Sequence, residues 1–215
     1  MAKRFFITAT NTDIGKTYTT KLILKEFASR GFKVGVIKPI ETGVVNGYCP
    51  DGEELLRCVQ ELNEEFNNIT IDDIVPIQHE LAAAPFVAND SKELEVNKIN
   101  KSVEKLEKLC DILVFEGAGG LFVPIDSKYM IIDLIRLYKC SALLVTHCSL
   151  GCINDTLLSK KALDDAKIKN TVGFNCRKND ASFSKVTQPY FDAIDFDVMR
   201  VDENIDKICD VLYNL

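Results

Sequence analysis

The strongest chemical signal in the sequence is a short loop near the amino terminus that ends in Gly-Lys-Thr. Residues 8–17 read Thr-Ala-Thr-Asn-Thr-Asp-Ile-Gly-Lys-Thr and lie between an apolar run and a helical pattern. Backbone NH groups at such a helix start, together with the helix dipole, bind phosphate. In this motif Lys16 reaches the β- and γ-phosphates, and the Thr17 hydroxyl binds Mg²⁺. The general pattern has a glycine where this chain has Thr10, but the strand-then-helix context still predicts a nucleotide-binding P-loop.

A second candidate site is a glycine-rich segment that follows a strongly apolar run. Residues 114–120 read Val-Phe-Glu-Gly-Ala-Gly-Gly. An acid at the end of a buried strand is typical of a direct or indirect Mg²⁺ ligand in nucleotide-hydrolysing folds, which makes Glu116 a candidate. The glycines would let the backbone approach the phosphates closely. The alternative is a glycine-rich turn that only ends a strand, and the P-loop elsewhere in the chain favours the first interpretation.

Two further segments place polar groups where ligands bind in α/β folds. Lys38, in Val-Ile-Lys-Pro-Ile-Glu-Thr-Gly, ends an apolar run, so its ammonium should emerge at the carboxyl edge of the sheet. It could instead only cap the strand or pair with Glu41. Residues 150–154, Leu-Gly-Cys-Ile-Asn, precede a helical pattern, and such a helix start could bind an anion such as a carboxylate. Gly151 and Asn154 could equally form a turn and a cap.

The elements that must position these residues alternate between strands and helices. Nearly continuous apolar runs predict strands covered on both faces, and i, i+3, i+4 periodicity predicts helices. The predicted strands are 5–9, 33–38, 111–116, 141–146, 170–174 and 196–201, and the predicted helices are 15–30, 96–109, 130–138, 153–166 and 204–212. This alternation predicts an α/β class: one P-loop domain over residues 1–215, with a mainly parallel, doubly wound sheet flanked by helices. The irregular stretch 42–50 is predicted to be a mobile loop.

Composition narrows the class of protein further. The 215 residues are 47% hydrophobic and 27% charged, a balance that suits a globular core. The net charge of −6 and the lack of a basic stripe argue against nucleic acid as a partner, and no apolar window is long enough to span a membrane. The start of the chain does not read as a secretion signal. The eight cysteines, none spaced as Cys-x-x-Cys, are therefore expected to be reduced thiols in the cytoplasm, neither disulfides nor zinc ligands.

The four segments, in this order, resemble those of the dethiobiotin synthetases. That family carries Thr-x-Thr-x-x-Gly-Lys-Thr, Lys-Pro-(x)-x-Ser/Thr-Gly, Glu-Gly-Ala-Gly-Gly and a segment close to Leu-Gly-Cys-Ile-Asn, and the match runs from Phe5 to about Thr156. The resemblance implies a homodimeric enzyme that uses ATP, Mg²⁺, CO₂ (or bicarbonate) and 7,8-diaminopelargonate to make dethiobiotin, ADP and phosphate. The implied route forms a carbamate, which ATP phosphorylates before the second amine closes the ring.

The resemblance also implies roles for individual residues. Lys16 and Lys38 would act on the transferring phosphate and the carbamate, and Thr17, Asp51 and Glu116 would surround Mg²⁺. The implied nucleotide-binding residues are Thr12, Asp13, Ile14, Gly15, Lys16, Thr17, Tyr18, Glu116, Gly117, Ala118 and Gly119. The implied substrate-binding residues are Thr42 at the amine or carbamate end and, from the other subunit at the carboxylate tail, Leu150, Gly151, Cys152, Ile153 and Asn154.

Two departures from the family pattern affect the site. Asp51 is placed through a Pro-Asp-Gly turn, and the neighbouring acids Glu53 and Glu54 are alternatives for its role. The family reads adenine with an asparagine just past a strand, where this chain has Arg177, with Asn175 two residues earlier. Selectivity for ATP over other nucleoside triphosphates is therefore left open by the sequence.

Two other classes of P-loop protein are alternatives. Cobyrinate and cobyric acid synthase domains usually accompany an amidotransferase domain with a Cys-His pair, for which this chain has no room. Nucleotide-switch ATPases of the partitioning or Min type commonly carry an additional lysine early in the P-loop, where this chain reads Thr-Asn-Thr-Asp-Ile. They also often carry a terminal amphipathic helix, and the helix predicted at 204–212 lacks the basic face that favours membranes. The sequence thus favours the ligase and retains the switch ATPase as its alternative.

Overall fold

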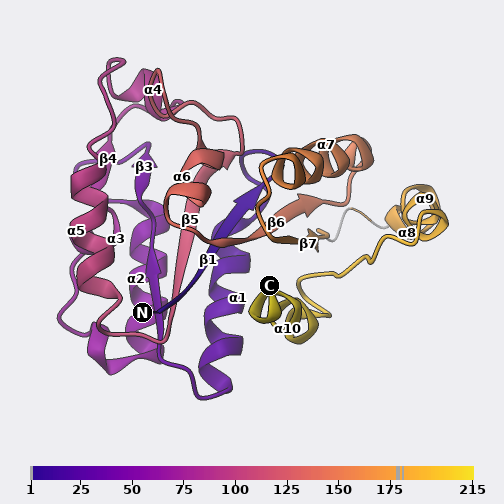
Figure 1. The fold of residues 1–215 in the computed structure, drawn as a ribbon, viewed down its shortest axis with the longest axis horizontal. Helices are drawn as coiled ribbons and strands as arrows, with labels where there is room; N and C mark the ends of the chain where they lie inside the picture. The colour runs from indigo at the N-terminus through magenta and orange to yellow at the C-terminus, as the bar shows by residue number, and fades with distance from the viewer. Residues whose placement is uncertain (1, 178–179, 181) are drawn as a thin grey trace.

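The architecture is a parallel sheet with helices packed on its faces (Figure 1). The computed structural model describes residues 2–177, 180 and 182–215. Its five-stranded sheet has the order β2-β5-β1-β6-β7, with every neighbouring pair parallel. The strands are β1 (Lys3–Ala9), β2 (Val34–Ile37), β5 (Ile112–Gly120), β6 (Ser141–His147) and β7 (Asn170–Asn175). The predicted fold class is confirmed, and the apolar runs are those of strands that helices cover.

Five of the helices lie in two layers. On one face α1 (Lys16–Ser29) packs against both α2 (Pro50–Leu62) and α10 (Ile205–Asn214). On the opposite face α6 (Ile131–Leu137) packs against β5, and α7 (Cys152–Asp165) packs against β6 and β7. This is the arrangement expected when the connections between parallel strands are right-handed. The remaining elements are α3 (Ile71–Ile74), α4 (Pro85–Ala88), α5 (Val96–Leu106), α8 (Phe183–Val186), α9 (Gln188–Ala193) and the 3₁₀ turn η1 (Glu64–Phe66). Among the described helices, none is long and apolar enough to cross a membrane.

Most predicted elements are confirmed within a few residues, but the strand predicted at 196–201 is wrong. This segment has only one isolated parallel bridge, between Phe174 of β7 and Arg200. The Phe174 NH donates to Met199 O at 2.7 Å, and the Val201 NH donates to Phe174 O at 3.0 Å. Met199 and Val201 are both buried. The apolar pattern of residues 196–201 therefore belongs to a coil that packs beside the edge strand β7 and buries Met199 and Val201.

The sequence also did not reveal a small second sheet and the helix that follows it. β3 (Ile40–Thr42) pairs in parallel with β4 (Ile77–His79). The stretch 42–50 leaves β3, forms an antiparallel bridge between Val45 and Tyr48, and enters α2 at Pro50. Proline suits this first helical position, because its missing NH would have no partner there. The mobility expected of this stretch stays a prediction.

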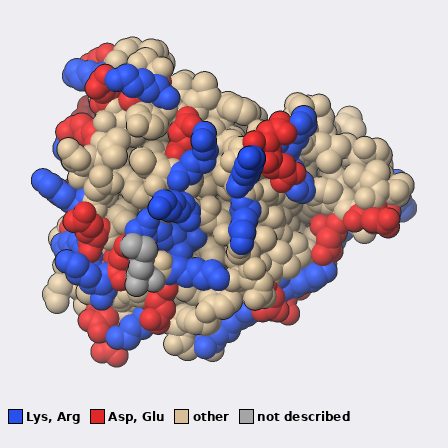
Figure 2. Space-filling view, in the orientation of Figure 1, with Lys and Arg blue, Asp and Glu red and all other residues tan. Residues whose placement is uncertain are grey.

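The surface carries both signs of charge close together. On the face shown in Figure 2, Lys and Arg side chains are interspersed with Asp and Glu. Along α7, Lys160 and Lys161 each pair at 2.9 Å with the aspartate four residues further on. These lysines are therefore balanced locally.

The prediction that all eight cysteines are free thiols is wrong for one pair. Cys148, just after β6, is disulfide-bonded to Cys176, just after β7, with the two Cα atoms 4.9 Å apart. The register of the strands explains the pairing, because His147 lies opposite Asn175 and the cysteines are the next residues along. The other six cysteines are free and five of them are buried, where a thiol acts as a small apolar side chain.

We expect this disulfide to contribute substantially to stability. In the loop-closure model, a disulfide between residues 28 apart in sequence reduces the conformational entropy of the unfolded chain. This raises the free energy of unfolding by about 3.5 kcal/mol. Urea unfolding of oxidised wild-type protein and of Cys176→Ser measures the difference, with Cys110→Ser, at a half-buried free thiol, as the matched control. Thiol titration of the unfolded, unreduced protein should count the six free cysteines. A count of all eight would contradict the assignment.

Candidate active site

Three of the four predicted segments converge at the carboxyl edge of the sheet. The P-loop follows β1, Lys38 follows β2 and Glu116 lies in β5, and these strands are neighbours. The direction in which the chain connects successive strands reverses at β1. Ligands bind at such a reversal in open α/β sheets. A cleft of about 930 Å³ opens there. The predicted residues that line it are Thr12, Asp13, Gly15, Lys16, Thr17, Lys38, Thr42, Asp51, Ala118 and Gly119.

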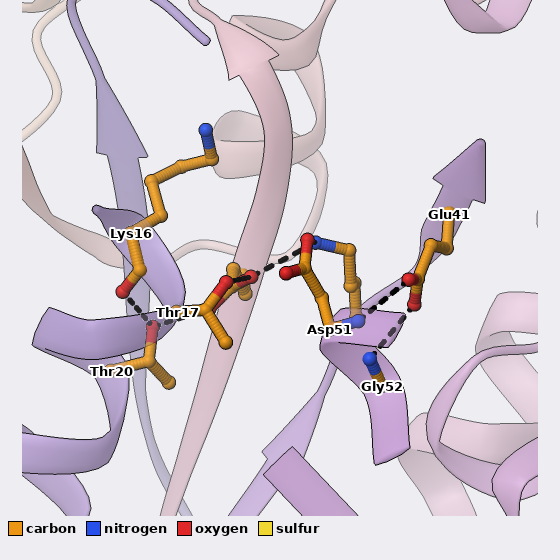
Figure 3. Close-up of polar contacts among 8 residues, drawn as sticks. Lys16, Thr17, Thr20, Glu41, Asp51 and Gly52 are labelled. Carbon is orange, nitrogen blue, oxygen red and sulfur yellow. Dashed lines mark hydrogen bonds and ion pairs between the residues drawn. The ribbon is translucent and has the colours of Figure 1, made fainter. Parts of the chain in front are cut away.

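A fully buried carboxylate, Glu116, is the centre of the polar contacts at this cleft. Its Oε1 accepts hydrogen bonds from Thr17 Oγ1 and Lys38 Nζ, both at 2.9 Å, and its Oε2 accepts one from Thr20 Oγ1 at 2.6 Å. Lys38 Nζ lies 2.6 Å from Asp51 Oδ2 as well. Figure 3 shows Thr17 between Thr20 of α1 and Asp51 at the start of α2. One carboxylate therefore connects α1, β2 and β5, and through Lys38 it reaches α2.

The register of β2 against β5 explains why Lys38 meets Glu116. Ile37 lies opposite Phe115 in the ladder, so the next residue on each strand forms the ion pair. The alternative that Lys38 pairs with Glu41 is wrong, because among the described residues its ion pairs are with Asp51 and Glu116. Lys38 is therefore more than a strand cap, since it holds two carboxylates together.

The charges in the cleft shift one another's pKa values. Burial would lower the pKa of Lys38, but the carboxylates of Glu116 and Asp51 outweigh it and raise that pKa above its ordinary value. Burial would raise the pKa of Asp51, but the charge and hydrogen bond of Lys38 and the Thr17 hydroxyl lower it. For Lys16, burial and then the positive charge of Lys38 lower the pKa. Lys38 and Asp51 are thus held in their charged forms.

The P-loop is supported by Asn175, the last residue of β7, and by Arg177 just after it. Gly15 has φ of +95° at the N-cap of α1, and a Cβ there would clash with the Asn175 side chain. Asn175 Nδ2 donates to Ile14 O at 2.7 Å, and the Arg177 guanidinium donates to Asp13 O. Arg177 also lines the cleft. Asn175 lies two residues before the position at which the family carries its adenine-reading asparagine. In this structure its side chain binds the P-loop backbone.

Besides the fully buried Glu116, three predicted nucleotide-binding residues lie beside the cleft without lining it. Ile14 uses its carbonyl to accept the hydrogen bond from Asn175, and Gly117 is buried within β5. Tyr18 is exposed and its hydroxyl contacts Asp202 at 2.5 Å. A role in phosphate binding for these three would use their backbone NH groups.

The fourth predicted segment lies on the surface, away from the cleft lining. Gly151 has φ of +101° and is the N-cap of α7. Leu150 is 88% exposed, whereas Cys152 is buried. Asn154 Nδ2 contacts Asp155 Oδ1 at 3.2 Å and remains exposed. Within one chain this segment is an exposed helix start.

Several cleft residues gave little signal in the sequence. The small side chains of 82–85, between β4 and α4, form one wall with Val123, and apolar residues of this size do not indicate a site. Glu41 also lines the cleft. Thr20 of α1 donates a hydrogen bond to Glu116. The one indication of this in the sequence is that Thr20 lies one helical turn after Lys16, on the same face of the helix.

The oxygen atoms of Thr17, Asp51 and Glu116 suit a hard divalent cation. Mg²⁺ is commonly held by one or two carboxylates with the remaining positions taken by water and phosphate oxygens. In the described part of the chain no group of three His, Cys, Asp or Glu could hold a metal, so this site would need the hydroxyl and a nucleotide. Asp51 fits better than Glu54, which pairs with Lys21 at 2.5 Å.

Removing the Lys38 charge should destabilise the metal-free protein. In Lys38→Met, Glu116 stays fully buried without its cation, a change that costs about 3–5 kcal/mol in other buried pairs. Urea unfolding at pH 7 with EDTA measures this loss. Lys98→Met is the matched control, because the ion pair of Lys98 with Glu95 is exposed. Its loss should lower the free energy of unfolding by less than about 0.5 kcal/mol. Equal losses in the two variants would contradict the importance of the buried pair.

Sequence comparisons relate the chain to one group of enzymes. The profile of a family described as an AAA domain matches residues 3–210. The ATP-dependent dethiobiotin synthetase BioD of Sulfurovum sp. is 44% identical over 189 residues, which cover 88% of this chain and 90% of that protein. The protein of the same name from Wolinella succinogenes is 31% identical over 213 residues, or 98% of each chain.

Comparison with solved structures shows the same fold at low sequence identity. The MinC:MinD cell division complex of Aquifex aeolicus matches with a TM-score of 0.53 and 14% identity, covering 97% of this chain and 85% of that chain. A ParA family ATPase from Chlorobium tepidum matches with a TM-score of 0.53 and 10% identity, covering 100% and 93%. At such identities the likeness shows the fold alone.

Proposed function

The chain belongs to the family of ATP-dependent dethiobiotin synthetases, and we propose that it closes the ureido ring of 7,8-diaminopelargonate with CO₂ and ATP. The proposed products are dethiobiotin, ADP and phosphate. The observation that best supports this function is the position of Lys38, whose ammonium lies 2.6 Å from Asp51 and 2.9 Å from Glu116 in the cleft that the P-loop borders. A P-loop ATPase that only switches between states has no evident need for this second buried lysine.

The proposed reaction joins two anions. One amine of the diamine attacks CO₂ and loses a proton, which forms a carbamate. A carbamate oxygen then attacks the γ-phosphorus of ATP and ADP leaves, so that a carbamic-phosphoric anhydride forms. The second amine attacks the carbonyl carbon, phosphate leaves with the bonding electrons, and a further proton is lost. The step between carbamate and γ-phosphate needs nearby positive charge to offset repulsion.

Two lysines that line the cleft, Lys16 and Lys38, would supply that charge. Lys16, at the start of α1, would neutralise the transferring phosphate. Lys38 would contact the carbamate and the γ-phosphate, and Thr42, which lines the same cleft, would hydrogen-bond the amine or carbamate end. Holding both reactants in one orientation can lower the barrier by roughly 7–11 kcal/mol. The remaining protein contribution is therefore mainly positional.

The metal and the second subunit complete the proposal. Thr17, Asp51 and Glu116 would hold Mg²⁺, which when bound offsets phosphate charge. We place the carboxylate tail of the substrate at the α7 start, Leu150–Asn154, of a partner subunit in a homodimer. The exposure of Leu150, Gly151 and Asn154 supports that placement. We further propose that residues 1–215 act as one domain and that the enzyme works in the cytoplasm, where the Cys148–Cys176 disulfide would be open to reduction.

Product formation tests the proposed function directly. Purified protein is given MgATP and bicarbonate with and without 7,8-diaminopelargonate, and phosphate and dethiobiotin are quantified, the latter by mass spectrometry. We expect stoichiometric phosphate and dethiobiotin only when the diamine is present. Diamine-independent ATP hydrolysis without dethiobiotin would favour a nucleotide-switch ATPase instead.

Lys38→Met separates ring closure from nucleotide binding. We expect this variant to make no measurable dethiobiotin, because the carbamate loses its cation, while its affinity for ADP stays within about threefold, less than 1 kcal/mol. Measurements use a temperature at which circular dichroism shows the variant folded. Near wild-type turnover would show that Lys38 has no part in the reaction.

Asn154→Ala tests the placement of the substrate tail. We expect the KM for 7,8-diaminopelargonate to rise about tenfold, the loss typical of one hydrogen bond to a charged group, with the KM for ATP unchanged. Asn97→Ala, at an exposed position in α5, is the matched control. Equal changes in both KM values would indicate that Asn154 only supports the helix start.

A further inference from the structure

Glu41 is a buried acid at the cleft that the proposed reaction does not use. It lies in β3, its residue is 3% exposed, and it lines the cleft. Its Oε1 accepts a hydrogen bond from the backbone NH of Asp51 at 2.8 Å, and its Oε2 accepts one from the NH of Gly52 at 2.9 Å. Figure 3 shows the carboxylate facing these two NH groups. Both oxygens of Glu41 are thus occupied by the first turn of α2.

The contact supplies a cap that α2 lacks locally. The first NH groups of a helix have no partner within the helix, and the N-cap residue here, Cys49, makes no side-chain capping bond. A carboxylate at this position gains both from charge-assisted hydrogen bonds and from the positive end of the helix dipole. Glu41, nine residues before the helix begins at Pro50, therefore fixes the helix start to the small sheet.

The first turn of α2 is closely packed at Gly52. A Cβ on Gly52 would lie 3.0 Å from Glu41 Oε2 and would also collide with Ile71 of α3 and with Val75, which follows α3. The first turn of α2 is thus pressed between the Glu41 carboxylate and apolar side chains. Glycine is required at position 52 because these side chains lie too close to its Cα for a Cβ to fit.

The same turn carries Asp51 into the cleft. Its backbone NH binds Glu41, while its side chain reaches Lys38 Nζ at 2.6 Å. Glu41 itself forms no ion pair with Lys38 among the described residues, so it does not serve as the counter-ion. Its connection to the reacting groups runs through the backbone of Asp51.

We infer that Glu41 is a positioning residue, which holds the first turn of α2 so that the Asp51 carboxylate faces Lys38, Glu116 and the P-loop. This inference rests on the proposed role of Asp51 as a metal ligand. Residues that orient a metal ligand through a hydrogen bond commonly change metal affinity by about 10- to 100-fold when replaced. The effect of Glu41 should therefore appear in metal binding before any turnover.

The test measures Mn²⁺ binding to the full chain by electron paramagnetic resonance in the presence of ADP. Glu41→Gln keeps the size of the side chain but presents an NH₂ group to one of the two helix NH groups. We expect its Kd for Mn²⁺ to rise about tenfold or more, with metal-free ADP affinity within twofold of wild type. If Glu41→Gln does not fold, Glu41→Asp, which withdraws the carboxylate by one methylene, provides the same comparison.

A matched control separates positioning from general stability. Asp126 is likewise buried and accepts hydrogen bonds from the NH groups of Leu94, Lys128 and Tyr129 at 2.7, 2.7 and 2.8 Å. Asp126→Asn should lower the melting temperature as Glu41→Gln does, yet leave the Kd for Mn²⁺ within twofold. A Glu41→Gln effect no larger than that of Asp126→Asn would overturn the inference.

Asp51→Asn distinguishes failure of the inference from failure of the proposed site. We expect Asp51→Asn to weaken Mn²⁺ binding, and Glu41→Gln to add no further loss in that background, because Glu41 acts through Asp51. If Asp51→Asn binds Mn²⁺ like wild type, the metal role of Asp51 and the inference built on it are both wrong. If Asp51→Asn weakens binding while Glu41→Gln alone does not, only the inference is wrong.

Discussion

The site depends on one buried carboxylate that must keep its hydrogen bonds. Glu116 has no contact with solvent and accepts from Thr17, Thr20 and Lys38. An ionised group at such depth is tolerated only when it is paired and hydrogen-bonded. The P-loop helix, the end of β2 and the middle of β5 are therefore constrained to meet at this point. The hydrogen bonds of Glu116 therefore set the geometry of the cleft.

Around this centre, neighbouring segments hold the P-loop and the α2 start from outside. Asn175 and Arg177 bind backbone carbonyls of the P-loop, and the disulfide of Cys176 joins the same segment to the loop after β6. On the other side Glu41 binds the first turn of α2. Rigid support of this kind lets side chains keep one orientation, which a reaction based on positioning requires.

The fold alone does not distinguish a ligase from a switch ATPase. MinD and ParA structures share the architecture at 14% and 10% identity, whereas dethiobiotin synthetases share up to 44% identity over most of the chain. Function belongs to the site placed on the fold. In this chain the proposed ligase site contains a second lysine, Lys38, and the acids that pair with it.

The sequence by itself determined the fold class, the P-loop and the acid within the buried part of β5. These depend on local signals: apolar runs, helical periodicity and the Gly-Lys-Thr motif. Only the tertiary structure decided that Lys38 pairs with Asp51 and Glu116, that Glu41 binds the start of α2, and that Cys148 meets Cys176. It also decided that 196–201 is coil. These outcomes depend on which strands are neighbours and in what register, and no local pattern records contacts between segments far apart in the chain.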